Sequence, residues 1–219
     1  VREIKNSNKK KASDLNRIVR QNIERCEKKI QIHISTLEKN SNPEIYRLYG
    51  ELITANIHNL SKGMEKCSLL NYYEPEQTYV EIKLDENRTP QENAQWYFKK
   101  YTKAKISRSF AAEQLKLAKT ELEYLENVLY SIENADSADI IEQIREELRT
   151  QGYIHKTNSR RKSAAQSLPL KFISSEGYPI WVGRNNMQND ELTLKRAKTT
   201  DMWLHTKNIP GSHVIARIP

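Results

Sequence analysis

In one stretch of this sequence, mostly apolar residues recur at the alternating spacing of three and four that a coiled coil requires. The repeat runs through residues 97–132, and only one of its members, Arg108, is charged. Its positions are Tyr97, Tyr101, Ala104, Arg108, Ala111, Leu115, Ala118, Leu122, Leu125, Leu129 and Ile132. A helix with such a stripe buries it against another helix, so the chain must supply or find a long helical partner.

The first 40 residues offer that partner, because their apolar residues also recur at helical spacing. These residues are Leu15, Val19, Ile23, Cys26, Ile30, Ile34 and Leu37. Residues 41–89 lie between the two stripes and give the chain room to reverse. We therefore predict a long antiparallel coiled coil within one molecule, and a coiled coil between two molecules is the alternative.

The residues between the two long helices predict a small tip. Pro43 suits the first turn of a second helix over 44–60, which Asn42 would cap and Gly63 would follow. Two runs rich in β-forming residues, 69–73 and 78–84, flank a turn at 74–77 and predict a β-hairpin. Thr89, Pro90 and Glu92 then form the pattern of a capping box, which begins the next long helix.

The remainder of the chain changes in character. Residues 137–151 predict a short amphipathic helix, and 154–167 are polar, basic and without apolar period, as in a linker. From 168 we expect strands at 170–174, 178–183, 202–206 and 213–218, with a helix at 191–197. The predicted fold is mainly α: an antiparallel intrachain coiled coil with a β-hairpin tip (1–153), a linker (154–167) and a partial α/β (α+β) domain (168–219).

Composition narrows the classes of partner. The net charge is +8 and the pI about 9.3, so the surface should attract polyanions such as RNA, DNA or anionic lipid. Lipid is the least favoured, because no apolar run approaches the length of a bilayer span and the first residues lack the apolar core of a secretory signal. Cys26 and Cys67 show no pairing or metal-binding spacing, which favours a reducing, cytoplasmic location.

Basic residues concentrate in three places that are candidates for RNA binding. They are the run from Lys9 to Lys29, the group Lys99, Lys100, Lys103 and Lys105 followed by Arg108, and the linker residues Lys156, Arg160, Arg161 and Lys162. Such residues neutralise phosphates without reading sequence. A solvated helix face is the alternative. Trp96, Tyr97, Phe98 and Tyr101 lie among the second group, where base stacking is conceivable but packing of the tip is favoured.

A polar loop after the second C-terminal strand is a further candidate. It contains Arg184, Asn185, Asn186, Gln188 and Asn189. These side chains can contact phosphates and base edges. Alternatively, the asparagines hold the backbone of a turn and Asp190 caps the following helix. The residues alone do not separate the two interpretations.

The sequence offers little for catalysis or for a metal. His205 and His213 have Asp201 nearby but no third histidine or cysteine, so we predict no metal site and no cofactor. Ser212 precedes His213, yet adjacent residues of a strand point to opposite faces and cannot form a nucleophile–base pair. We therefore expect a binding module and not an enzyme.

Several motifs together resemble the NFACT family of ribosome quality-control proteins, many of which are labelled fibronectin-binding proteins. The motifs are IYRLYGELITANIHNL (45–60), NYYEP (71–75), PQENAQWYFKKYTKAK (90–105), VGRNNMQNDELT (182–193) and DMWLHTKNIPGSHVI (201–215). The last two are specific. The resemblance covers most of the chain, and it implies a coiled-coil and middle region followed by the start of the RNA-binding NFACT-R domain.

The resemblance also implies partners. Members of the family recognise obstructed large ribosomal subunits that carry peptidyl-tRNA, through rRNA and a stalk-base protein, and recruit tRNA for C-terminal alanine tailing. On this basis Arg184, Asn185, Asn186, Gln188, Asn189, His205 and His213 are expected to face RNA, whereas Trp203 is expected in the core. The family's N-terminal domain and helix-hairpin-helix are absent from these residues and the R domain stops at Pro219, so tailing is not expected of this stretch by itself.

Two other functions remain as alternatives. The label of many family members suggests a surface adhesin that binds fibronectin or fibrinogen, which would require non-classical surface display, because the sequence shows no signal or disulfide framework. A coiled-coil scaffold without a nucleic-acid partner is the third interpretation.

Overall fold

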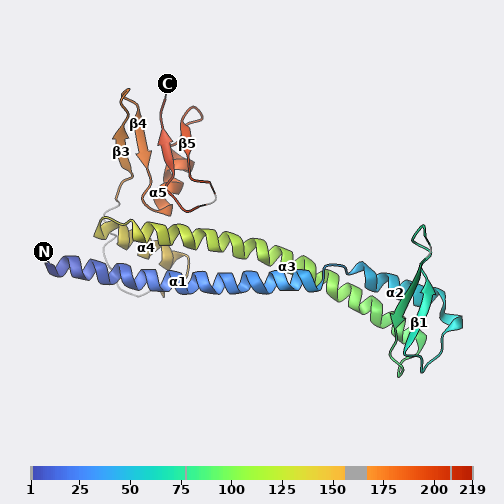
Figure 1. The fold of residues 1–219 in the computed structure, drawn as a ribbon. Coiled ribbons are helices and arrows are strands. Elements are labelled where there is room, and N and C mark those ends of the chain that lie inside the picture. Colours follow the sequence, from blue (N-terminus) through green and yellow to red (C-terminus); the bar gives the residue numbers. More distant parts are fainter. Residues whose placement is uncertain (1, 77, 156–166, 208, 219) are drawn as a thin grey trace. The chain divides into compact units, whose positions relative to one another are not determined.

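The computed structural model describes residues 2–76, 78–155, 167–207 and 209–218, and the chain is mainly α-helical, as predicted. Two long helices, α1 (Arg2–Lys39) and α3 (Pro90–Glu133), account for much of it (Figure 1). The residues form two compact units, one of 1–28 with 118–219 and the other of 29–117. Both long helices contribute to each unit.

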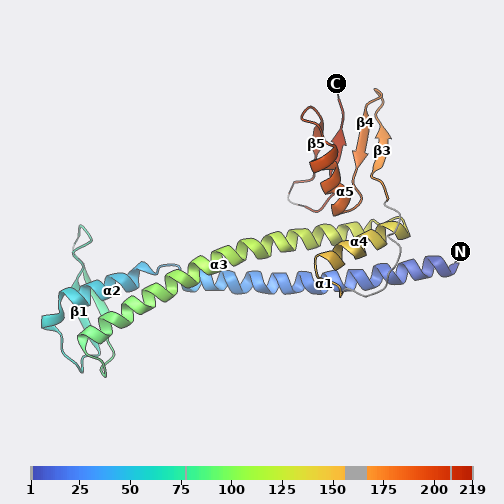
Figure 2. The ribbon, with the colours of Figure 1, turned by 180° about the vertical axis from the view of Figure 1, so that it is seen from behind.

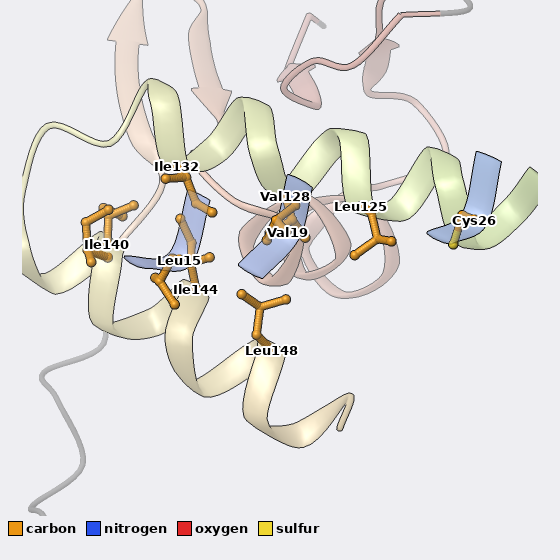
Figure 3. Packing of buried hydrophobic residues seen from close by; sticks show 10 residues of the cluster. Leu15, Val19, Cys26, Leu125, Val128, Ile132, Ile140, Ile144 and Leu148 are labelled. Atoms are coloured by element: carbon orange, nitrogen blue, oxygen red, sulfur yellow. The ribbon is translucent and has the colours of Figure 1, made fainter. Parts of the chain in front are cut away.

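The core of the first unit is made by three helices. Leu15 and Val19 of α1 meet Leu125 and Val128 of α3, and the third helix, α4 (Ala138–Thr150), completes the cluster (Figure 3). The fully or nearly fully buried members are Leu15, Val19, Cys26, Leu125, Val128, Ile132, Ile140, Ile141, Ile144 and Leu148. Each large apolar side chain buried here contributes about 1.5–3 kcal/mol relative to exposure. The predicted pairing of the two stripes within one molecule is thus confirmed here.

The second unit holds the tip. It contains α2 (Glu44–Ala55), the short helical turn η1 (Ile57–Asn59) and the hairpin of β1 (Lys66–Leu70) and β2 (Tyr79–Lys83), which lies beside α2 and the start of α3 (Figure 2). Its buried core consists of Leu52, Ile53, Cys67, Leu69, Ile82, Ala94 and Tyr97. The Tyr97 hydroxyl donates a hydrogen bond of 2.6 Å to the Lys83 carbonyl, and burial raises the pKa of Tyr97 to about 12. Tyr97 therefore packs the tip, as favoured from the sequence.

The seam continues through the second unit, where α3 contributes alanines to it. Ile30 of α1 is buried there, as are Ala104 and Ala111 of α3. The charged seam residue, Arg108, donates through Nη1 to the Ser41 carbonyl at 2.8 Å. This carbonyl follows the end of α1, so the guanidinium supplies a donor where helical backbone bonding has ended.

The local sequence signals of the tip predicted the correct types of element but not their exact ends. The capping box at the start of α3 is confirmed: the Thr89 N–H donates to Glu92 Oε2 at 2.7 Å, and the Glu92 N–H donates to Thr89 Oγ1 at 3.3 Å. The second helix was predicted to reach residue 60, but α2 ends at Ala55, where the Asn56 side chain donates to the Leu52 carbonyl. The first strand was predicted at 69–73, but β1 ends at Leu70, and Asn71 accepts from the Tyr73 N–H in the turn.

The C-terminal part of the first unit contains a four-stranded antiparallel sheet in the order β3-β4-β6-β5. Its elements are β3 (Leu170–Ile173), β4 (Pro179–Val182), α5 (Asn186–Asp190), the π-helical turn η2 (Glu191–Arg196), β5 (Met202–Leu204) and β6 (Val214–Ala216). The prediction that Trp203 is core is wrong, because β5 is an edge strand and Trp203 is 49% exposed.

Two other expectations concern the chain as a whole. Among the described residues, none of the helices combines the length and hydropathy needed to cross a bilayer. The predicted domain boundary at 154–167 falls mostly on 156–166, outside the described residues, and stays a prediction.

Candidate nucleic-acid interface

Asn185 immediately precedes α5 and determines how this short helix begins. Its Oδ1 accepts from the Gln188 N–H at 2.9 Å, and its Nδ2 donates to Gln143 Oε1 of α4 at 2.9 Å. Asn185 is therefore the helix cap, and the prediction that Asp190 caps a helix at 191–197 is wrong because the helix starts five residues earlier. Asparagine is a preferred residue at this position, because its side-chain oxygen accepts a hydrogen bond from an unpaired N–H in the first turn of a helix.

Gln188 and Asn189 hold the loop from inside. Gln188 Oε1 accepts from the Arg184 N–H at 3.1 Å, and its Nε2 donates to the Ser167 carbonyl at 2.9 Å. Asn189 Oδ1 accepts from the His213 N–H at 3.0 Å. The Asn189 side chain also fits closely against Gly183, where an added Cβ would collide with Oδ1. Exposed fractions of 1%, 3% and 6% for Asn185, Gln188 and Asn189 leave little of them for a ligand.

The other two polar side chains of the loop contact α4 and the link between α3 and α4. Asn186 Nδ2 donates to Glu147 Oε1 of α4 at 3.2 Å, and the Tyr124 hydroxyl donates to the same oxygen at 2.9 Å. Burial is the main cause of a raised pKa for Glu147. Arg184 Nη1 lies 3.1 Å from Asp136 Oδ1. These contacts support the structural interpretation of the loop, and its RNA-facing role stays a prediction.

The structure brings the two candidate histidines together. The ring centroids of His205 and His213 are 4.9 Å apart, and the Trp203 ring lies 5.8 Å and 5.4 Å from them. Burial and the neighbouring His205 lower the pKa of His213, whose Nδ1 is 2.7 Å from Thr193 Oγ1. The exposed Trp203 is a planar ring of the kind on which nucleic-acid bases stack. Nothing in the sequence indicated that Trp203 is exposed, because residues 202–204 have the composition of an apolar strand.

Asp201 does not join the histidines in a metal site. Its carboxylate accepts from Arg217 at 2.7 Å and from the Lys198 N–H at 3.0 Å, and Arg217 lowers the pKa of Asp201 to about 2. In the described part of the chain, no three His, Cys, Asp or Glu side chains converge as metal ligands.

The four candidate lysines of α3 differ in their surroundings. Lys99 and Lys103 are exposed and line one shallow groove. Lys100 Nζ lies 3.9 Å from the centroid of Trp96, a cation–π contact. Lys105 Nζ is 3.4 Å from the Tyr101 hydroxyl. Lys99 and Lys103 are thus the pair best placed for a polyanion, whereas Lys100 and Lys105 contact neighbouring aromatic residues.

The third basic group follows α4 in the sequence. Lys156, Arg160, Arg161 and Lys162 all lie outside the described residues. Their predicted role in RNA binding stays a prediction.

Comparison with known proteins identifies the family. A family model described as NFACT N-terminal and middle domains matches residues 2–167. The chain belongs to the NFACT family. This match confirms the resemblance inferred from the motifs, and the matched residues of the NFACT chain include α1 to α4.

The NFACT chain also matches curated proteins. It is 42% identical over 212 residues to a Bacillus subtilis protein named Rqc2 homolog RqcH, a match that covers 95% of this chain and 37% of the relative. A Streptococcus suis protein of the same name is 38% identical, and that match covers 93% and 36% respectively. The chain therefore spans little more than a third of the length of these relatives.

A solved structure has the same fold. It is the C-terminal part of the fibronectin/fibrinogen-binding protein from Streptococcus suis, with a TM-score of 0.71 and 31% identity. The match covers 96% of this chain and 70% of the other. The proteins to which this chain is similar thus carry two kinds of name, and only the name of the solved structure states what it binds.

Proposed function

We propose that this chain is the binding arm of a ribosome-associated quality-control factor. The whole factor recognises obstructed large ribosomal subunits carrying peptidyl-tRNA and supports C-terminal alanine tailing. The similarity to proteins named Rqc2 homolog RqcH supports this role. The observation that carries it is the pair Lys99 and Lys103, exposed on α3 and without a carboxylate partner among the described residues.

In this proposal the chain binds RNA electrostatically in the cytoplasm. It needs neither catalysis nor a cofactor to do so. Lysines on the helix displace counterions from rRNA phosphates, which gives affinity without sequence specificity. The surface of Trp203, His205 and His213 adds planar rings for an unstacked base, for example of tRNA. Helix α3 carries the two lysines, and the strand β5 with the residues beside it carries the aromatic surface. A stalk-base protein is a further proposed contact.

A sedimentation experiment with purified large subunits tests this function. Replacing Lys99 and Lys103 by Glu should weaken co-pelleting of the full-length factor by about tenfold or more. It should also lower the slope of log affinity against log salt by about one for each phosphate that is no longer neutralised. Replacing Lys116 and Lys119 by Glu makes the same charge change at two other exposed positions of α3 and is the matched control. Co-pelleting that is equally strong in the Lys99/Lys103 variant would refute the proposal.

Fibronectin or fibrinogen binding at the cell surface is a second candidate, supported only by the name of the structural relative. Surface plasmon resonance with immobilised fibronectin separates the two. Nanomolar binding that is insensitive to salt, with no association with large subunits, would favour the adhesin.

A further inference from the structure

Helix α3 carries apolar side chains on the face opposite its seam. Ile106 and Phe110 are 64% and 59% exposed, although they lie one helical turn apart on a helix whose other face is packed. Together with Phe98, Thr102 and Ser107 they line a groove of about 660 Å³. Contiguous exposed apolar surface of this kind marks an interaction site more often than isolated exposed residues do.

One end of the groove is fixed by the tip. The ring of Phe98 packs against Gly50 of α2 so closely that an added Cβ would lie 2.8 Å from two ring carbons. Phe98 is half-buried and belongs to the margin of the hairpin core. The groove is therefore preformed at this end, which lowers the entropic cost of binding.

The charged groups of the groove are all of one sign. Lys99 and Lys103 are its charged lining residues, and neither has a carboxylate within salt-bridge distance in the part of the chain that the structure describes. A ligand that covers Ile106 and Phe110 would gain further affinity from acidic groups at this edge.

We infer that this groove is the docking site for an amphipathic α-helix of a partner protein. The partner helix places apolar side chains four residues apart over Ile106 and Phe110, and acidic side chains beside Lys99 and Lys103. Residues 98–110 extend about 18 Å along α3, which matches a partner of about three helical turns. This inference rests on the proposed function and specifies how a protein partner docks, which that function leaves open. It shares two lysines with that function, so its test depends on the apolar residues.

Two other occupants fit less well. A second copy of the chain would bring the lysines of both copies to one groove, and like charges brought together across an interface oppose binding. An RNA strand would use the lysines but gains no stacking from the aliphatic Ile106, which lies between them and Phe110.

Fluorescence anisotropy with a synthetic probe tests the inference directly. The probe is a labelled 14-residue helical peptide with leucines four residues apart and two flanking glutamates, titrated with the full chain. We expect saturable micromolar binding, reduced tenfold or more by Ile106→Ser with Phe110→Ser, and similarly reduced when the glutamates of the peptide are replaced by lysines. Leu117→Ser, at a 56% exposed position of the same helix outside the groove, should leave binding unchanged.

Three outcomes would overturn the inference. The first is absence of binding, and the second is equal binding by the Ile106/Phe110 variant, with circular dichroism confirming that all variants remain helical. The third is self-association in analytical ultracentrifugation that disappears in this variant, which would assign the groove to a second copy. The ribosomal proposal is judged separately, because it fails only if the Lys99/Lys103 variant still co-pellets with large subunits.

Discussion

Asn185 is the residue on which most of the polar loop depends. Replacing it by Ala removes the helix cap and leaves Gln143 without one donor, so the free energy of unfolding should fall by about 1–3 kcal/mol. Urea denaturation of the chain measures this change. Met187→Ala, two residues away and 48% exposed, is the control and should change little. Unchanged stability combined with a loss of RNA affinity would contradict the structural role.

Glu147 predicts a specific dependence of stability on pH. Its pKa in the folded chain is raised by burial, so its contribution to stability is complete below the unfolded value of about 4.3 and is lost as pH rises through the folded value. Glu147→Gln keeps an acceptor for Tyr124 and Asn186 but cannot ionise. The variant should therefore gain stability over the natural chain as pH increases.

Urea midpoints of both proteins at pH 4.5 and 7.5 measure this effect, because the other titrating groups cancel in the difference. A difference between the variant and the natural chain that stays constant over this range would show that Glu147 does not titrate as its burial requires.

The sequence indicated which loop residues are important better than it indicated what those residues do. Asparagine and glutamine side chains serve equally to hold a turn and to contact RNA, and local sequence does not reveal that Gln143 and Glu147, some forty residues away in the chain, take up their hydrogen bonds. Trp203 was misplaced for a similar reason, because exposure on an edge strand depends on sheet order and not on the strand's own residues.

The coiled-coil seam allows a matched comparison of two leucines within helix α3. Leu125 is completely buried in the first unit, whereas Leu117 of the same helix is 56% exposed. Leu125→Ala should lower the free energy of unfolding by about 2–5 kcal/mol, because apolar burial is reduced and a cavity is left behind. Leu117→Ala should cost less than about 0.5 kcal/mol.

Chemical denaturation of the two variants measures this contrast. Equal losses of stability at both positions would mean that the seam is not the buried face of α3.

The long helices were predictable because their signals are local and repeated. Spacings of three and four fix the buried face, and Thr89 with Glu92 fixes the start of α3. The docking of α4 could not be predicted in the same way. Val128 lies outside the heptad positions and is nevertheless 1% exposed, because Ile144 and Leu148 of α4 belong to the same core.

Because the chain has two separate buried cores, we predict that one unit can open while the other stays folded. Leu52 is fully buried in the second unit and has no part in the core of the first. Leu52→Ala should therefore increase amide hydrogen exchange in residues 44–104 by about one to three orders of magnitude, with a much smaller change in 138–150. Exchange followed by mass spectrometry measures both segments at once, and an equal increase in the two would mean that the chain unfolds as a single cooperative unit.

The placement of the two cysteines has a practical consequence. Cys26 lies in the core of the first unit and Cys67 in that of the second, and burial raises the pKa of the Cys67 thiol. A thiol reagent reaches each sulfur only when its surroundings open. The natural chain therefore carries one buried thiol in each unit. The two rates of thiol labelling would report the opening of each unit without any engineered probe.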